Sequence, residues 1–139
     1  AANVGLSYRS NNNIFLSADF NYYNNMYLSM SPIYRTDAVI TTGMTAEDIA
    51  HLRRQEKFDS AYTLNASIGK NWYIHRQYTL GFSLEVKNIL NNQAIRTGGY
   101  EQTRLTKNTE TTVTTYQAFD SKYFYMFGTT YYLNLYFRF

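Results

Sequence analysis

Apolar and polar residues alternate with a period of two along most of the 139-residue chain. The C-terminal stretch is the clearest case, because one set of alternate positions is apolar and comprises Tyr131, Leu133, Leu135, Phe137 and Phe139. The positions between them include Asn134 and Arg138. This period is that of a β-strand with two different faces. We therefore predict that residues 123–139 form one strand.

Four earlier segments alternate in the same way. Their apolar positions are Val4, Leu6 and Tyr8; Ile14, Leu16, Ala18, Phe20 and Tyr22; Tyr62, Leu64, Ala66 and Ile68, continuing to 72–74; and Leu80, Phe82, Leu84 and Val86. Polar turns at 10–13 and 75–77 join these segments in pairs, and long stretches at 24–57 and 91–122 separate the pairs. The pattern predicts an all-β fold, an antiparallel up-and-down meander of about five strands.

The connections alternate between short and long, which is typical of bacterial outer-membrane barrels. In such barrels the periplasmic turns are short and the extracellular loops are long. The terminal segment also has aromatic residues near its ends and leucines in its middle, as a strand that crosses a bilayer does. On this interpretation the five strands are transmembrane. Residues 10–13 and 75–77 are then periplasmic turns, and 24–57 and 91–122 are extracellular loops.

Composition agrees with a β protein. Aromatic residues make up 18% of the chain, with 15 Tyr, and such residues favour pleated, half-buried surfaces. There is no Cys, which excludes a disulfide scaffold and a Cys-based metal site. No run approaches the roughly 18 apolar residues of a membrane-spanning helix. The net charge is only +3 and the basic residues are scattered, so nucleic acid is not an expected partner.

Five strands are too few to close a membrane barrel by themselves. The smallest single-chain barrels have about eight strands, and an open edge in lipid would leave backbone groups unpaired. We therefore expect the remaining strands in a longer polypeptide, with closure by several short chains as a rarer alternative. The residues Ala1–Arg9 already alternate, which also predicts part of a longer protein or a processed product. A mature terminus is the alternative.

Few residues have a pattern that indicates chemistry. Thr45-Ala-Glu-Asp48 is similar to a capping box, which predicts a short helix from Ala46 to about Glu56. Glu47 and His51 are four apart on it, but two ligands are too few for a metal site, so we expect a solvated helix face. Asp19, Glu85 and Lys87 fall on the expected inner faces, and ordinary lumen polarity is favoured there over contact with substrate or a plug domain.

The second long stretch contains the candidate ligand-binding residues, which are Tyr100, Tyr116 and Phe119. They could stack on a sugar or peptide ligand, although packing against neighbouring loops is the commoner role of loop aromatics. Gly98-Gly99 predicts a tight turn with positive φ, and 107–115, with five Thr, predicts a loop or an extra hairpin. Asn65-Ala-Ser67 matches a glycosylation motif but lies in an expected strand, so it is uninformative.

No Ser/His/Asp or Cys/His set is present, so no enzyme activity, cofactor or metal is expected.

One segment is similar to a known family. Glu85-Val-Lys-Asn-Ile-Leu-Asn-Asn92 resembles a signature near the carboxy end of TonB-dependent outer-membrane receptors. Further segments resemble a branch of these receptors that carries an immunoglobulin-like or carboxypeptidase-regulatory-like domain at its amino terminus; they are 34–36, 58–64, 68–72, 97–104 and 123–139. The resemblance implies a plugged barrel of about 22 strands in the Gram-negative outer membrane. Such a receptor imports a nutrient (a glycan, a peptide or a metal chelate) with energy delivered through TonB.

The resemblance also implies the partners. They are outer-membrane lipid, the remaining barrel strands, the plug domain and, through the amino-terminal part absent from this chain, TonB. A surface lipoprotein is a further candidate partner. The chain would hold the last strands of the barrel and could not transport alone. Its terminal residues Tyr131, Leu133, Leu135, Phe137 and Phe139 would be recognised by the barrel-assembly machinery. A soluble, tyrosine-rich β-sandwich that binds carbohydrate is the alternative.

Overall fold

The computed structural model describes residues 1–36, 44–75, 77–107 and 114–139. These residues divide into two compact units, each described separately below. The first unit comprises 1–24, 60–95 and 126–139, and the second comprises 25–59 and 96–125. Most described residues lie in β-strands, so the all-β prediction is confirmed. No helix in these ranges is long and apolar enough to cross a membrane.

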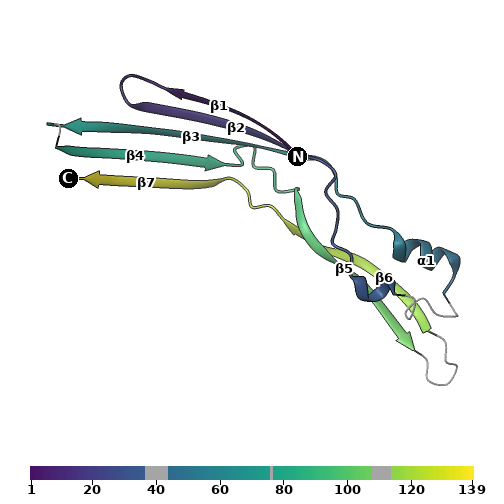
Figure 1. Ribbon diagram of the computed structural model, residues 1–139. Helices are drawn as coiled ribbons and strands as arrows, with labels where there is room; N and C mark the ends of the chain where they lie inside the picture. Colours follow the sequence, from purple (N-terminus) through teal and green to yellow (C-terminus); the bar gives the residue numbers. More distant parts are fainter. Residues whose placement is uncertain (37–43, 76, 108–113) are drawn as a thin grey trace. The chain divides into compact units, whose positions relative to one another are not determined.

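The first unit is a single antiparallel sheet of five strands (Figure 1). The strands in spatial order are β1 (Ala2–Arg9), β2 (Ile14–Tyr23), β3 (Ala61–Ile74), β4 (Tyr78–Lys87) and β7 (Thr130–Arg138). Each strand pairs with the next antiparallel, so the predicted meander is confirmed. The predicted short connections are also present, since Asn13 N donates to Ser10 O at 3.0 Å and Gln77 N donates to Ile74 O at 3.2 Å. Residue 76 lies outside the described ranges.

The register gives the sheet two different faces. One face is apolar, with rows such as Tyr8, Leu16, Ile68, Leu84 and Leu133. The other face is polar, with rows such as Ser7, Ser17, Ser67, Glu85 and Tyr132. Every residue of β1 and β7 is exposed, and Leu135 on the apolar face is 70% exposed. The apolar face is therefore uncovered along both edge strands.

Two aromatic rings on the polar face lie over glycines of the neighbouring strand. Phe15 pairs with Gly69, and Tyr136 pairs with Gly81. A Cβ atom added to either glycine would collide with the ring of its partner. Each ring therefore occupies the space that a side chain would need, so a larger residue at 69 or 81 would have to displace it.

The terminal stretch 123–139 is not one strand, so that prediction is wrong. Tyr125 ends β6 (Thr114–Tyr125), and β7 begins only at Thr130. The backbone between these two strands makes hydrogen bonds outside the sheet. Met126 N donates to Ile95 O at 2.9 Å, and the side-chain amide of Asn88 donates to Phe127 O at 3.0 Å.

The long stretch 91–122 is not irregular throughout, because it contains β5 (Arg96–Lys107) and most of β6. These two strands pair antiparallel as a separate sheet in the second unit, which fits the hairpin alternative for 107–115. Residues 108–113 lie outside the described ranges. Gly98-Gly99 is not a tight turn but part of β5, next to a shift in register. The expected positive φ is present at Gly99, at 151°.

The first long stretch forms the rest of the second unit, with the 3₁₀ helix η1 (Pro32–Arg35) and the helix α1 (Ala46–Arg53). The predicted capping box is confirmed, since Asp48 N donates to Thr45 Oγ1 at 3.1 Å and Thr45 N donates to Asp48 Oδ2 at 2.9 Å. The helix ends before the predicted limit because the backbone next to it is extended. Leu28 N donates to Glu56 O at 2.9 Å there. Among the side chains of this unit that the structure describes, Leu28, Leu52 and Phe58 are buried.

Candidate functional site

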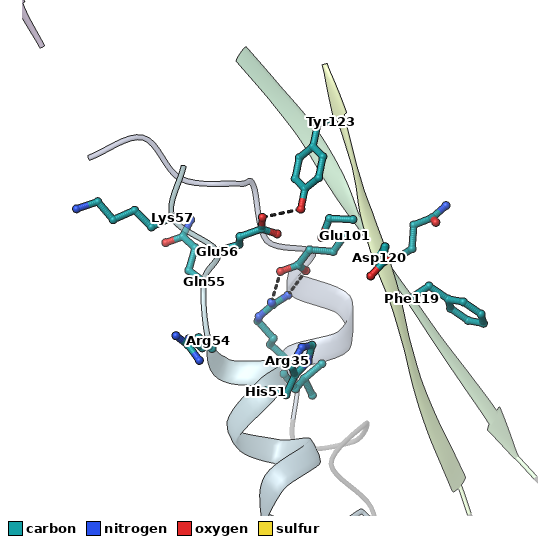
Figure 2. Close-up of a pocket in the computed structure, with 13 residues that line it drawn as sticks. Arg35, His51, Arg54, Gln55, Glu56, Lys57, Glu101, Phe119, Asp120 and Tyr123 are labelled. Atoms are coloured by element: carbon teal, nitrogen blue, oxygen red, sulfur yellow. Dashed lines mark hydrogen bonds and ion pairs between the residues drawn. The ribbon is translucent and has the colours of Figure 1, made fainter. Parts of the chain in front are cut away.

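A pocket of about 470 Å³ lies in the second unit (Figure 2). Its walls come from the end of α1, from the extended segment 54–57 and from one stretch each of β5 and β6. A volume of this size is within the range of small-molecule sites. The capping box starts α1 at a defined residue, and the backbone pairing of 27–28 with 56–57 places the segment that follows.

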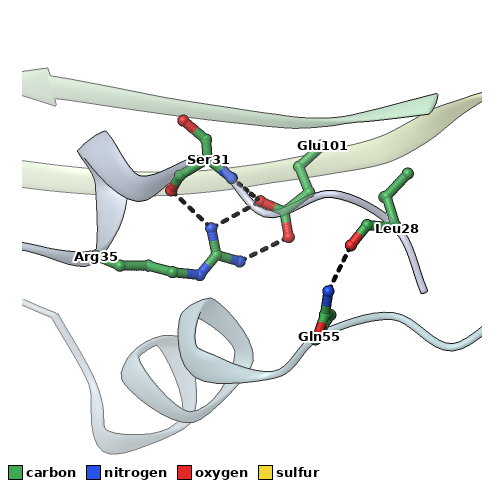
Figure 3. Close-up of polar contacts among 5 residues, drawn as sticks. All are labelled: Leu28, Ser31, Arg35, Gln55 and Glu101. Carbon is green, nitrogen blue, oxygen red and sulfur yellow. Dashed lines mark hydrogen bonds and ion pairs between the residues drawn. The ribbon is translucent and has the colours of Figure 1, made fainter. Parts of the chain in front are cut away.

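An ion pair between Arg35 and Glu101 forms one part of the pocket wall (Figures 2 and 3). The two Nη atoms of Arg35 donate to the two carboxylate oxygens of Glu101 at 2.8 and 2.6 Å. Ser31 joins them, because its O accepts from Arg35 at 2.9 Å and its N donates to Glu101 at 3.3 Å. Each side chain is only 15% exposed. The pair fixes η1 against β5 and leaves little charge for a ligand.

A second polar group joins Glu56 to β6. The Tyr123 hydroxyl donates to Glu56 Oε1 at 2.6 Å, and Arg96 Nη1 lies 3.5 Å from the same oxygen. The Arg96 guanidinium also lies over the Tyr123 ring, 4.2 Å from its centroid. The hydrogen bond to Glu56 raises the pKa of Tyr123, and desolvation and the Glu56 charge act in the same direction. Tyr123 therefore stays neutral as a donor at physiological pH.

Charged side chains of both signs line the pocket. Its two acid side chains described above are already hydrogen-bonded. Within the described ranges, no group of three or more His, Cys, Asp or Glu could hold a metal ion. Arg54, Lys57 and Asp120 also line the pocket, which gives it accessible charges of both signs for a polar ligand.

Of the three aromatic residues predicted to bind a ligand, Phe119 is the one that the structure places in the lining of this pocket. Phe119 lines the pocket and is 40% exposed. Tyr100 is outside the lining and packs edge-on against Phe124, with ring centroids 6.2 Å apart. Tyr116 lies in β6 opposite Leu105, but its side chain is outside the described part. Of the helix residues considered for a metal, His51 lines the pocket and Glu47 is exposed.

Sequence reasoning missed the residues that build the pocket, which are Arg35, Glu56, Glu101 and Tyr123. Arg35 and Glu101 lie 66 residues apart along the chain, and no local pattern predicts such a pair. Tyr123 was assigned to the terminal strand instead of β6. The segments 34–36 and 97–104, which contain Arg35 and Glu101, were indicated by the family resemblance.

The apolar face of the sheet is a second candidate site, for lipid rather than for a ligand. Aromatic pairs lie toward both ends of the strands. Phe20 stacks on Tyr62 at 6.1 Å toward one end, and Trp72 contacts Phe82 at 5.8 Å toward the other. Near that second end Tyr78 also stacks on Phe137, at 5.8 Å. The rows between these pairs are almost entirely aliphatic.

The polar face of the sheet contains the three residues that the sequence analysis expected on the inner faces of the strands. Asp19 and Glu85 line a shallow hollow there, and Lys87 lies 3.4 Å from Glu85. Small hydrogen-bonded side chains surround them, as in the 2.7 Å contact between the Ser17 and Ser67 hydroxyls. Asn65 lies in β3, as expected. This face therefore has the ordinary polarity of a water-facing surface.

Asn88, in the segment with the receptor signature, has a structural role. Its φ of 51° is left-handed, which Asn tolerates better than most residues. Its side chain donates to Asn92 O at 3.2 Å and to Phe127 O at 3.0 Å, and accepts from Asn92 N at 3.1 Å. Its main-chain N donates to Asn65 Oδ1 at 3.0 Å. This residue is 4% exposed and joins the segment after β4 to the segment before β7.

Comparisons with protein-family models, curated proteins and solved structures gave no match. The receptor resemblance therefore stays a prediction from the segments quoted above.

Proposed function

We propose that the five-stranded sheet is a wall segment of an outer-membrane β-barrel, and that the chain is part of a TonB-driven nutrient importer. The observation that supports this most is the register of the sheet. Each of the five strands places its larger aliphatic residues on one face and most of its polar residues on the other, although Phe15 lies on the polar face and Lys70 on the apolar one. In a barrel wall the first face meets lipid and the second faces the lumen.

The spacing of the aromatic residues fits the thickness of a membrane. About ten residues separate Tyr62 from Trp72 along β3, which corresponds to about 33 Å at about 3.3 Å per residue. Barrel strands tilt by about 35–45°, so this length spans about 25 Å across the bilayer. The apolar band of outer-membrane barrels is also about 25 Å tall, with aromatic residues at both borders.

The connections support an orientation. Because the strands are antiparallel, both long excursions leave from the same end of the sheet, after Tyr23 and after Lys87. The short turns 10–13 and 75–77 lie at the opposite end. Long loops are extracellular in these barrels, so the second unit would be extracellular and its pocket would contribute to the capture of a glycan, a peptide or a metal chelate.

The soluble sandwich alternative needs a second sheet large enough to cover the apolar face. Within the described ranges the other sheet has two strands, β5 and β6. An apolar face of five strands is therefore better explained by lipid.

Placing an arginine at each of two adjacent residues of β4 tests the proposal. Leu84 lies in the middle of the apolar face, and Ser83 is next to it on the polar face. Leu84→Arg should cost on the order of 2–4 kcal/mol near the bilayer midplane, and it should reduce the protein recovered in the outer-membrane fraction. Ser83→Arg is the matched control and should assemble normally. Equal assembly of both variants, or recovery of the unmodified chain as a soluble monomer, would contradict a barrel wall.

A further inference from the structure

Lys70 has an unusual position on the sheet. Its row across the sheet contains Ile14, Phe82 and Leu135, so it belongs to the apolar face. It is the one charged residue on that face among the described residues of the five strands. A charge facing hydrocarbon is costly unless the side chain reaches the interface or finds an opposite charge.

The surroundings of Lys70 point toward the membrane interface. Its Nζ lies 5.4 Å from the centroid of the Trp72 ring, which is within the range of a cation–π contact. Trp72 is one row nearer the end of the sheet with the short turns, where Tyr78 and Phe137 also lie. None of the ion pairs within the described ranges includes Lys70. Among the described residues its ammonium therefore has no carboxylate within ion-pair distance.

We propose that Lys70 and Trp72 form a site for the phosphate of an anionic phospholipid; this inference rests on the proposed barrel wall. The ammonium binds the phosphate, the Trp72 ring lies at headgroup level, and Leu135 and Ile14 contact the acyl chains. Because the site is at the short-turn end, the lipid belongs to the periplasmic leaflet. Phosphatidylglycerol has the required charge.

Fluorescence quenching can test the site directly, because Trp72 is the single tryptophan of the chain. The protein, isolated from its host membrane, is placed in vesicles that contain phosphatidylcholine or phosphatidylglycerol with brominated acyl chains. Subtracting the signal of Trp72→Phe isolates the emission of Trp72. One favourable charge contact at a membrane surface predicts about a fivefold preference for the anionic lipid.

Two variants identify the source of the preference. Lys70→Gln should remove the preference and keep the quenching. Lys87→Gln, a matched change on the polar face, should keep both. Equal quenching by the two lipids in the unmodified protein would overturn the lipid site but leave the barrel wall intact. A preference that survives Lys70→Gln, or disappears in Lys87→Gln, would also overturn the site. Absence of quenching by either lipid would contradict the barrel wall itself.

Discussion

The ion pair of Arg35 and Glu101 is the most buried of those found among the described residues. Its geometry is bidentate, and Ser31 satisfies a further donor and acceptor of the pair. Removing one partner from such a pair leaves an uncompensated buried charge, which costs more than the pair itself contributes. The folding of the second unit should therefore be more sensitive to a single substitution here than to the loss of both charges.

Glu101→Gln should destabilise the second unit by about 3–5 kcal/mol, because the Arg35 guanidinium would stay buried without its counter-charge. The measurement is hydrogen exchange of the Leu28 amide, which donates to Glu56 O within the same unit. Arg96→Gln is the control, since its ion pair with Glu56 is about one-third exposed and should be worth about 1 kcal/mol or less. Equal acceleration of exchange in both variants would contradict the prediction.

Tyr123 gives the second unit a dependence on alkaline pH. Its pKa is raised above the ordinary value of 10.0, first by its hydrogen bond to Glu56. The raised pKa means that the contribution of this bond to stability is complete below about pH 10 and is lost as pH rises through the folded-state pKa.

A titration of tyrosinate absorbance, taken as the difference between the protein and Tyr123→Phe, measures this pKa. Glu56→Gln should move the curve back toward the ordinary tyrosine pKa, because it removes the main cause of the shift. A curve that does not move in Glu56→Gln would show that the hydrogen bond has no such effect.

At the scale of elements, Asn88 determines where β4 ends and where β7 can begin. Its amide bonds to Asn92 and to Phe127 O, and Thr129 Oγ1 donates to its main-chain O at 2.9 Å. These bonds join the segment that follows β4 to the segment that precedes β7, and β5 and β6 lie between these two segments in the chain. The hairpin is thus an insertion between two ends that are held together within the sheet unit.

Asn88→Ala should lower the free energy of unfolding by about 2–4 kcal/mol, because it leaves buried groups without partners and puts a less suitable residue at positive φ. Denaturant unfolding in detergent or lipid would measure the change. Asn134→Ala, at an exposed position on the polar face of β7, is the matched control and should change stability little. A similar small effect from both substitutions would count against a joining role for Asn88.

The strands of the main sheet could be predicted because their side chains alternate and their register follows from that alternation. The two strands of the hairpin were harder to predict than its position, since register shifts between Arg96 and Gly98 and between Tyr100 and Gln102 interrupt the period of β5. The break at 126–129 also had no local signal. Tyr125 and Tyr131 are six residues apart, so the alternation with a period of two continues from one to the other. Residues 126–129 between them are nevertheless outside the sheet, because Met126 bonds to Ile95 and Phe127 bonds to Asn88.

The pocket was less predictable than the sheet. Helix α1 could be placed from its capping box, and Phe119, one of three aromatic candidates for ligand binding, does line the pocket. Arg35 bonds to Glu101 and Glu56 bonds to Tyr123, and the members of each pair are more than 60 residues apart. A pattern within one sequence cannot predict contacts over such separations.

For the whole molecule, the terminal strand is the element on which assembly should depend. The resemblance to receptor barrels predicts that Tyr131, Leu133, Leu135, Phe137 and Phe139 are read by the assembly machinery. The first four share one face of the edge strand β7, and Phe139, directly after the strand, is 93% exposed. This arrangement leaves the apolar face of β7 accessible to a partner, because β7 is an edge strand and all of its residues are exposed.

Deletion of Phe139 should remove most of the surface-exposed protein, because the terminal aromatic ring would be missing from the signal. An antibody against 107–115, applied to intact cells, measures the exposed fraction. Phe139→Tyr is the control, since it keeps the ring and should keep assembly. Normal surface levels after the deletion would show that Phe139 has no part in the signal.

The rings that lie over Gly69 and Gly81 have a consequence for the evolutionary record of this chain. Phe15 and Gly69 share one site between β2 and β3, and Tyr136 and Gly81 share one between β4 and β7. A larger residue in place of either glycine fits only if its partner ring becomes smaller. Among related chains, positions 15 and 69 should therefore covary, as should 81 and 136, although each pair is widely separated in sequence.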